Sequence, residues 1–171
     1  LKDLPALCIV KDKILLDETI KKTKKFSEKK ENFVILGTGG SNLGSKALIN
    51  ILLGRENKKI FFYDNIDPLS FKNSIDQLNI ENTAFIVISK SGSTPETISQ
   101  FASLIEYFEQ KDKLNFFFSN TLVITEDKES PLTHIAYKNN CTTFKHEDNI
   151  GGRYSIFSNV GMVPAIIAGL N

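Results

Sequence analysis

Five short, wholly apolar segments recur along the chain, separated by longer stretches in which apolar residues repeat every three or four positions. Continuous apolar runs are typical of strands buried on both faces, and the longer repeat is typical of amphipathic helices. The alternation predicts an α/β fold, a five-stranded parallel sheet in a three-layer αβα sandwich with right-handed crossovers. The predicted strands are residues 33–36, 60–63, 84–88, 121–124 and 142–144, and the predicted helices are residues 45–53, 69–78, 95–108, 131–137 and 155–169.

Residues 11–32 differ from this pattern because charged residues, mostly lysines, outnumber the apolar ones. Leu16, Ile20 and Thr23 would share one face of a helix, and the charged residues would cover the opposite face. We therefore expect an amphipathic surface helix with a solvated basic face rather than a membrane or polyanion site. The predicted organisation is an N-terminal helical segment, residues 1–32, followed by one domain, residues 33–171, with a truncated C-terminal end.

The composition narrows the classes of protein to consider. A length of 171 residues suggests one domain, and a net charge of +1 gives no electrostatic case for a dedicated nucleic-acid binder. No apolar run approaches the roughly 20 residues of a membrane span, and no secretory leader opens the chain. Cys8 and Cys141 are too few for a disulfide framework, which favours a cytoplasmic location. Because the sequence begins at Leu1, has its only methionine at Met162 and ends at Asn171, we expect a segment of a longer polypeptide.

A glycine-rich loop, GTGGSNLG at residues 37–44, follows the first predicted strand and precedes a helix. Glycines let the backbone turn tightly, and a helix N-terminus offers N–H donors and partial positive charge, which together favour an anion. Ser41 can add a hydroxyl group. The loop has Asn42 in place of the third glycine of a Rossmann fingerprint, and it lacks the lysine of a Walker P-loop. A dinucleotide site using Asp64 and a purely structural turn are the alternatives.

A second loop, SKSGSTPET at residues 89–97, follows the third predicted strand and opens a long helix. Thr94 and Pro95 suit the N-cap and first helical positions, or Ser93 and Glu96 could form a capping box. Capping uses one or two hydroxyls and leaves the others for a polar cradle at the helix N-terminus. Since open sheets bind ligands at the carboxyl ends of their strands, the two loops predict a site for a phosphate monoester, with a structural turn as the alternative.

A third segment, GGRYS at residues 151–155, holds Arg153, one of only two arginines in a lysine-rich chain. Its planar, permanently charged guanidinium can stabilise an oxyanion, and the preceding glycines would allow close backbone approach to a ligand. The alternative is an ion pair with a carboxylate such as Asp148. His134 and His146 lack metal-spaced partners, so we expect no metal site.

Together the three segments resemble the glucose-6-phosphate isomerase family, whose members contain two sugar-isomerase (SIS) domains. The resemblance covers residues 33–169 and includes GTGGSNLG, FYDNIDP, SKSGSTPET and GGRYSIFSNVG in the family's order. It implies a flavodoxin-like SIS fold, with this chain as the first SIS domain and the second absent. By the same resemblance, Arg153 would be catalytic and stabilise a cis-enediolate, and Gly40 and Gly152 would let the sugar approach. The residues implied for the substrate phosphate are Ser41, Ser89, Lys90 (mainly through its backbone), Ser91 and Thr94.

The activity implied by the resemblance is the reversible isomerisation of glucose 6-phosphate to fructose 6-phosphate by general acid–base proton transfer. The family's glutamate base, histidine and lysine would lie beyond Asn171, so this segment alone would be inactive or nearly so. The expected partner is a phosphosugar, with no cofactor, nucleic acid or membrane, and with a homodimer for the complete protein. Alternatives are a non-catalytic phosphosugar-binding SIS module, an isomerase of another phosphosugar, including one that also accepts mannose 6-phosphate, and a nucleotide-dependent oxidoreductase.

Overall fold

The computed structural model describes residues 4–52 and 60–170, and its centre is a five-stranded parallel sheet. The strands are β1 (Asn32–Leu36), β2 (Ile60–Tyr63), β3 (Thr83–Ile88), β4 (Thr121–Thr125) and β5 (Thr142–Lys145). Their order in the sheet is β2-β1-β3-β4-β5, and every neighbouring pair is parallel. The predicted sheet is confirmed. Because the chain passes from β1 to β2 on one side and returns to β3 on the other, the loops after β1 and β3 flank the topological switch point.

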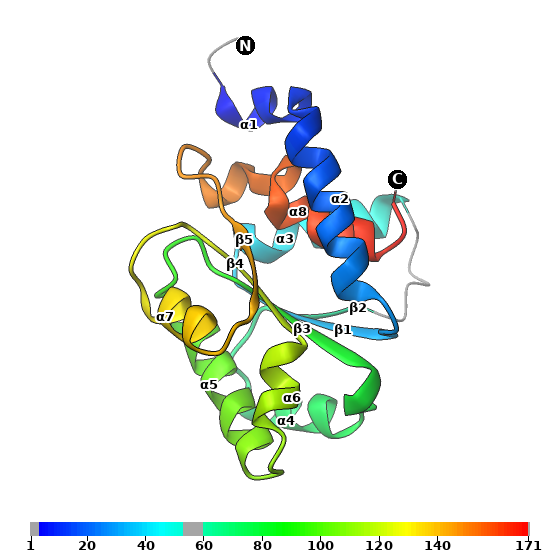
Figure 1. Ribbon diagram of the computed structural model, residues 1–171, viewed down its shortest axis with the longest axis vertical. Helices are drawn as coiled ribbons and strands as arrows, with labels where there is room; N and C mark the ends of the chain where they lie inside the picture. Colours follow the sequence, from blue (N-terminus) through cyan, green and yellow to red (C-terminus); the bar gives the residue numbers. More distant parts are fainter. Residues whose placement is uncertain (1–3, 53–59, 171) are drawn as a thin grey trace.

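Helices cover both faces of the sheet and complete the three layers (Figure 1). One face carries α4 (Pro68–Asp76), α5 (Pro95–Glu109), α6 (Leu114–Ser119) and α7 (Pro131–Lys138), and the other carries α2 (Lys13–Ser27), α3 (Gly40–Leu52) and α8 (Asn159–Ile167). The short α1 (Pro5–Cys8) lies at the end of the second layer, followed by the 3-10 turn η1 (Ile9–Lys11). Two further 3-10 turns are η3 (Ile80–Asn82) and η4 (Gly152–Phe157). None of the helices in the described parts of the chain is both long and apolar enough to cross a membrane.

The strands alternate between two hydrophobic cores. In β1, Val34 and Leu36 join the core beneath α5, while Phe33 and Ile35 join the core beneath α8. All six residues of β3 are buried, as expected for a central strand covered on both faces. This rigid double-sided core fixes the strand ends from which the loops of the candidate site project.

The structure contains two helices that the hydrophobic pattern did not predict, α1 and α6. In α6, Phe117 is fully buried, and its ring stacks on that of Phe108 from α5, with centroids 4.6 Å apart. Aromatic pairs of this kind add stabilisation beyond the area that they bury. The six residues of α6 are too few to establish a helical repeat, so only the tertiary contact identifies the helix.

Helix α2 is shorter than the predicted segment and is buried on a different face. Its buried side chains are Thr19 and Thr23, whereas Leu16 is 38% exposed, so the predicted face of Leu16, Ile20 and Thr23 is correct only in part. A buried hydrogen bond of 2.7 Å between Thr19 Oγ1 and Asn159 Oδ1 ties α2 to the start of α8. The division into segments 1–32 and 33–171 stays a prediction.

Two of the five helices predicted around the sheet begin about four or five residues away from their starts in the structure, whereas the other described ends of these helices differ by about two residues at most. The helix predicted from residue 45 begins at Gly40, inside the glycine loop, and its predicted end at Leu53 lies outside the described residues, as does Arg55. The helix predicted for residues 155–169 is divided into η4 and α8, because Ser158 caps α8 through a hydrogen bond from the Val160 N–H. The first correction matters for function because it places Ser41 within a helix N-terminal turn.

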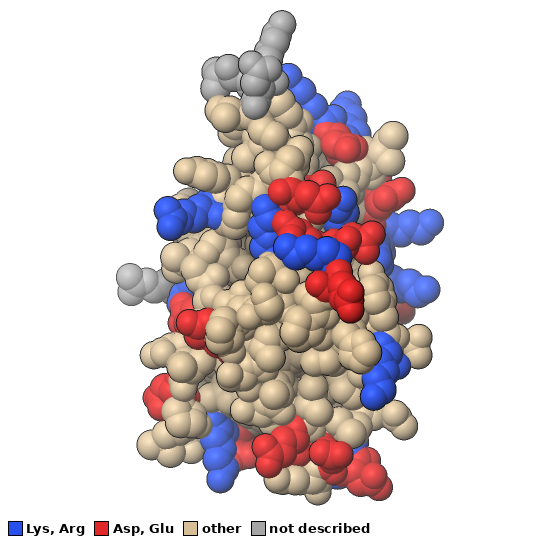
Figure 2. Space-filling model, turned by 90° about the vertical axis from the view of Figure 1, so that its left-hand side faces the viewer, with Lys and Arg blue, Asp and Glu red and all other residues tan. Residues whose placement is uncertain are grey.

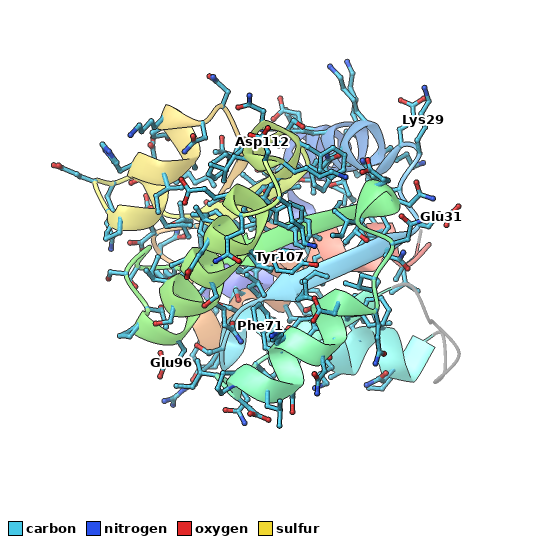
Figure 3. All side chains as sticks on the ribbon, turned by 90° about the horizontal axis from the view of Figure 1, so that it is seen from below. Lys29, Glu31, Phe71, Glu96, Tyr107 and Asp112 are labelled. Carbon is cyan, nitrogen blue, oxygen red and sulfur yellow. The ribbon has the colours of Figure 1, made fainter. Side chains whose placement is uncertain are left out.

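Helices α4 and α5 are neighbours on the face of the sheet that lies opposite α8. Figure 3 shows them from below. Phe71 on α4 and Tyr107 on α5 lie on the neighbouring walls of a groove between these helices. Phe71 also contacts Tyr63 at the end of β2 edge to face, with ring centroids 5.2 Å apart. This contact anchors α4 and the loop after β2 to the edge of the sheet.

Candidate functional site

A polar cavity of about 480 Å³ opens at the carboxyl edge of the sheet. Loops after β1, β3 and β4 contribute to its walls, together with the start of η4. Figure 2 faces the side on which several of these loops project, and acidic and basic side chains gather near the middle of that face. Seven of the eight predicted site residues line the cavity: Gly40, Ser41, Lys90, Ser91, Thr94, Gly152 and Arg153.

The glycine loop delivers Ser41 to the cavity through a sharp turn. Gly39 has a φ of +54°, a left-handed conformation that glycine adopts without a steric penalty, and α3 begins at the next residue. The Asn42 and Leu43 N–H groups donate to the Gly39 carbonyl, which closes the turn. Ser41 therefore stands at a helix N-terminus, where the partial positive charge of the helix favours an anion.

The glycine loop and the loop that carries Arg153 touch directly through their backbones. A Cβ atom built on Gly40 would lie 2.1 Å from the Gly152 carbonyl oxygen and 2.6 Å from the Arg153 nitrogen. Only glycine fits at position 40 in this arrangement. A Cβ on Gly152 would meet nothing within 4 Å, so this glycine leaves open space at the cavity wall.

The loop after β3, residues 89–94 and hereafter the serine loop, divides its hydroxyls between the cavity and the interior. Ser91 and Thr94 line the cavity. Ser89 is 1% exposed and lies behind them, with its Oγ 2.8 Å from Thr94 Oγ1 and 3.2 Å from the Gly92 nitrogen, whose N–H it accepts. Gly92, at a φ of +67°, makes the turn that this arrangement requires.

The predicted capping of α5 is correct in position but not in the groups used. Thr94 is the N-cap residue and Pro95 occupies the first helical position. The Thr94 side chain makes no capping hydrogen bond, and the alternative capping box of Ser93 and Glu96 is not formed. The Thr94 hydroxyl oxygen instead lies 2.8 Å from Ser89 Oγ and 3.5 Å from Ser91 Oγ. The hydroxyl thus remains at the cavity rather than at the helix end.

Arg153 presents an exposed guanidinium to the cavity, and no carboxylate within the described residues forms an ion pair with it. The alternative interpretation, a bridge to Asp148, is wrong because Asp148 pairs with Lys145 at 2.9 Å. At the start of η4, Ser155 Oγ donates to the Gly152 carbonyl at 2.7 Å and stabilises the turn. The turn beside Arg153 is therefore stabilised through Gly152, and the guanidinium has no carboxylate partner in the part of the chain that the structure describes.

Three residues that the sequence analysis did not single out, Thr38, Glu126 and Lys128, also line the cavity. Glu126 pairs with Lys90 at 3.3 Å and with Lys128. The hydrogen bond from Lys128, aided by that from Lys90, holds the pKa of Glu126 below its ordinary value even though burial opposes this shift. With one ionised carboxylate and the cations of Lys90, Lys128 and Arg153, the cavity has a net positive charge that suits an anionic ligand.

Other candidate chemistry finds little support in the described residues. No group of three or more histidine, cysteine, aspartate or glutamate side chains is placed to hold a metal ion there. Asp64, the acidic residue of the dinucleotide alternative, pairs with Lys46 at 3.2 Å. The cavity at the switch point, which seven of the eight predicted site residues line, is therefore the candidate site.

Comparison with known proteins agrees with this geometry. A protein-family model described as phosphoglucose isomerase matches residues 13–171, nearly the whole sequence. The chain belongs to the phosphoglucose isomerase family. A protein from Campylobacter jejuni named glucose-6-phosphate isomerase is 36% identical over 163 residues, which span 92% of this chain and 38% of that protein. The chain thus corresponds to less than half the length of this family member.

Two solved structures superimpose on most of this chain. The crystal structure of a hypothetical protein from Thermus thermophilus superimposes with a TM-score of 0.89 at 28% identity, covering 98% of this chain and 40% of that one. The structure of a glucose-6-phosphate isomerase from Chlamydia trachomatis gives a TM-score of 0.74 at 29% identity, covering 87% of this chain and 28% of that one. The resemblance inferred from the three motifs is confirmed, as is the phosphosugar-isomerase type of fold.

Sequence reasoning missed Glu126 and Lys128 because neither lies in a glycine-rich or hydroxyl-rich motif. One signal was available: the polar run TEDK follows the apolar strand at residues 121–124, so it reaches the same sheet edge as the other loops. The collected groups can bind a phosphate through hydroxyls, a helix N-terminus and cations, and can present the exposed guanidinium of Arg153 to a second charge. Among the described residues, no carboxylate or histidine stands free in the cavity to serve as a base, since Glu126 is doubly paired.

Proposed function

We propose that this chain is the N-terminal part of a glucose-6-phosphate isomerase and that the complete protein interconverts glucose 6-phosphate and fructose 6-phosphate. The observation that carries the proposal is the convergence of Ser41, Ser91, Thr94 and Arg153 on one cavity. Membership of the phosphoglucose isomerase family supports the reaction class. Ser89 holds Thr94 in place from the interior, so its role toward the phosphate is indirect.

The division of labour follows from the chemistry of isomerisation. A sugar phosphate dianion is held by the hydroxyls of Ser41, Ser91 and Thr94 at the N-termini of α3 and α5. Holding the phosphate fixes the two carbons that exchange the carbonyl, which turns binding into orientation. Removal of a proton next to the carbonyl develops negative charge on oxygen, and Arg153, unpaired with any described carboxylate, opposes that charge.

The proton is removed by a base that this chain does not supply, a glutamate in the second SIS domain. Gly152 leaves the backbone open beside the sugar, whereas the place expected for the sugar at Gly40 is filled by the Gly152 backbone. The complete protein acts in the cytoplasm as a homodimer and uses no cofactor. Analytical ultracentrifugation of the complete protein tests the dimer, and a sedimentation coefficient of a monomer contradicts it.

A coupled assay on the complete protein, with fructose 6-phosphate as substrate and the glucose 6-phosphate formed measured continuously, tests the function. We expect turnover by the complete protein and none, or almost none, by the 171-residue chain. Robust turnover by this chain alone would contradict the division of labour. Titrations with fructose 6-phosphate, mannose 6-phosphate, NAD and NADP separate the alternatives, because binding of a phosphosugar without turnover indicates a sensing module.

A further inference from the structure

The ammonium group of Lys90 is surrounded by three acceptors. Its Nζ lies 2.8 Å from the Ile150 carbonyl, 3.0 Å from the Asp148 carbonyl and 3.3 Å from Glu126 Oε1. A lysine ammonium carries three N–H donors, and three acceptors are in place for them. The group can donate to a phosphate only by giving up one of these contacts.

These contacts connect segments that are far apart in the sequence. Lys90 belongs to the serine loop, while Asp148 and Ile150 belong to the segment leading to Arg153. The Lys90 carbonyl also accepts the Glu126 N–H at 3.2 Å, so Lys90 joins the loops after β3, β4 and β5. The lysine thus acts through both its main chain and its side chain.

The segment that carries Arg153 is held at residues just before its two glycines and at the second glycine itself. The Lys90 ammonium donates hydrogen bonds to the carbonyls of Asp148 and Ile150, and the Gly40 backbone packs against Gly152. Without the ammonium contacts, the packing of Gly40 and the Ser155 hydrogen bond still hold Gly152, but the carbonyls of Asp148 and Ile150 lose their link to the serine loop. Glu126 completes the arrangement, because its carboxylate neutralises Lys90 from the side of β4.

We propose that Lys90 is a positioning residue: its ammonium fastens the segment 148–150 to the serine loop and so holds Arg153 at a fixed distance from the phosphate-binding hydroxyls. The proposal rests on the proposed function, in which Arg153 stabilises the developing oxyanion. The Lys90 side chain therefore acts on the reaction through Arg153, and it does not bind the phosphate. A direct phosphate ligand would instead affect the affinity for every phosphorylated ligand.

The test is steady-state kinetics of the complete protein with Lys90→Met, a side chain of similar length without donors. We expect kcat to fall roughly tenfold to a hundredfold, the range that a misplaced catalytic group costs. The KM for fructose 6-phosphate and the inhibition constant of inorganic phosphate should change by less than about threefold, because uniform binding is retained. Lys113→Met is the matched control, since Lys113 pairs with Glu81 outside the cavity and should leave kcat unchanged.

A double-mutant cycle shows whether Lys90 acts through Arg153. In an Arg153→Gln background, Lys90→Met should lower kcat by less than about threefold, because residues that act as a unit are not additive. Lys90→Arg keeps the charge but not the tetrahedral donor arrangement, so its kcat should lie between those of the wild type and Lys90→Met, with an unchanged KM. If Lys90→Met does not fold, Lys90→Arg is compared with the wild type in its place.

The outcomes separate this proposal from the proposed function. If the wild-type complete protein has no isomerase activity, the proposed function fails. If the wild type is active and the Lys90 variants keep its kcat, or raise KM and the phosphate inhibition constant instead, positioning by Lys90 is overturned. Additive losses for Lys90→Met and Arg153→Gln also overturn it.

Discussion

The hydroxyl oxygens of Ser89 and Thr94 lie 2.8 Å apart beneath the wall of the cavity. Ser89 is fully enclosed and also accepts the Gly92 N–H, whereas Thr94 reaches the cavity itself. The buried serine therefore orients the loop and the threonine hydroxyl, and the threonine is available to a ligand. Two hydroxyls from one motif thus serve different purposes.

Thr94→Ala should weaken binding of fructose 6-phosphate by the complete protein roughly tenfold or more, the cost of one hydrogen bond to a charged group. The free energy of unfolding of the 171-residue chain should fall by about 0.5–1.5 kcal/mol, because the hydrogen bond to Ser89 is lost. No capping loss is added, since the Thr94 side chain does not cap α5. Isothermal titration calorimetry and urea unfolding measure the two effects.

Two variants control this prediction. Thr94→Ser keeps the hydroxyl and should retain most of the affinity. Ser103→Ala removes an exposed hydroxyl of α5 that donates to the Ser99 carbonyl. The affinity for fructose 6-phosphate should therefore be unaffected. An unchanged affinity in Thr94→Ala removes this residue from the phosphate site.

Arg153→Lys in the complete protein should lower kcat more than it raises KM. The change keeps a positive charge but replaces a planar, weakly hydrated donor with a flexible ammonium, and Arg153 has no carboxylate among the described residues to hold it in place. Loss of one donor to a developing oxyanion costs about a hundredfold or more in kcat, and lysine should recover part of this. Steady-state kinetics measures both parameters, and an unaltered kcat excludes Arg153 from the mechanism.

Much of the site follows from the sequence because its residues come from contiguous motifs at strand ends. Ser91 and Thr94 could be placed by the apolar run before them and the helix signal after them. The different position of Ser89, behind the cavity wall, depends on a turn at Gly92 that the letters alone do not specify. Glu126 was missed because its importance arises from its ion pairs with two lysines, one of which is distant in sequence.

The fold shows the same limit. Strong local patterns, such as the wholly apolar β3, were sufficient to predict the sheet. By contrast, α6 owes its place to Phe117 packing against Phe85 and Phe108, contacts that no local pattern expresses. The start of α3 at Gly40 was missed because glycines ordinarily disfavour helices, and here close packing against Gly152 requires one.

The contact between Gly40 and Gly152 gives a direct test of the packing between their loops. Gly40→Ala places a methyl group 2.1 Å from the Gly152 carbonyl oxygen, so the two loops must separate. We expect the free energy of unfolding of the 171-residue chain to fall by about 2 kcal/mol or more. Thermal unfolding followed by circular dichroism measures this loss.

Gly152→Ala is the matched control, because its methyl group meets nothing within 4 Å and the backbone there is not left-handed. Its unfolding free energy should stay within about 0.5 kcal/mol of the wild type, the range of substitutions that disturb no contact. Its affinity for fructose 6-phosphate in the complete protein should still fall, if the space beside Gly152 admits the sugar. Equal stability of the two alanine variants contradicts the close approach.

His146 lies just before the segment that Lys90 holds, and its side chain is fully buried. Its Nδ1 is 3.1 Å from the Glu147 carbonyl, while Nε2 has no hydrogen-bond partner among the described residues. Burial lowers the pKa of His146 below its ordinary value of 6.5, and Lys90 acts in the same direction. The Glu147 carbonyl and the carboxylates of Glu126 and Asp148 oppose the shift without reversing it.

His146→Gln should make the stability of the 171-residue chain less sensitive to acid. In the unfolded wild type, His146 binds a proton once the pH falls below its ordinary pKa of about 6.5. The folded chain binds this proton only at a lower pH, so between the two values unfolding is coupled to proton uptake. The contribution of His146 to stability is thus complete above the ordinary pKa and is lost as the pH falls toward the depressed folded value. Urea unfolding between pH 7.5 and pH 5, a range of about two and a half units, should show a steeper decline for the wild type than for His146→Gln. His134→Gln, at an exposed position, should follow the wild type, and parallel curves for all three proteins contradict a neutral, buried His146.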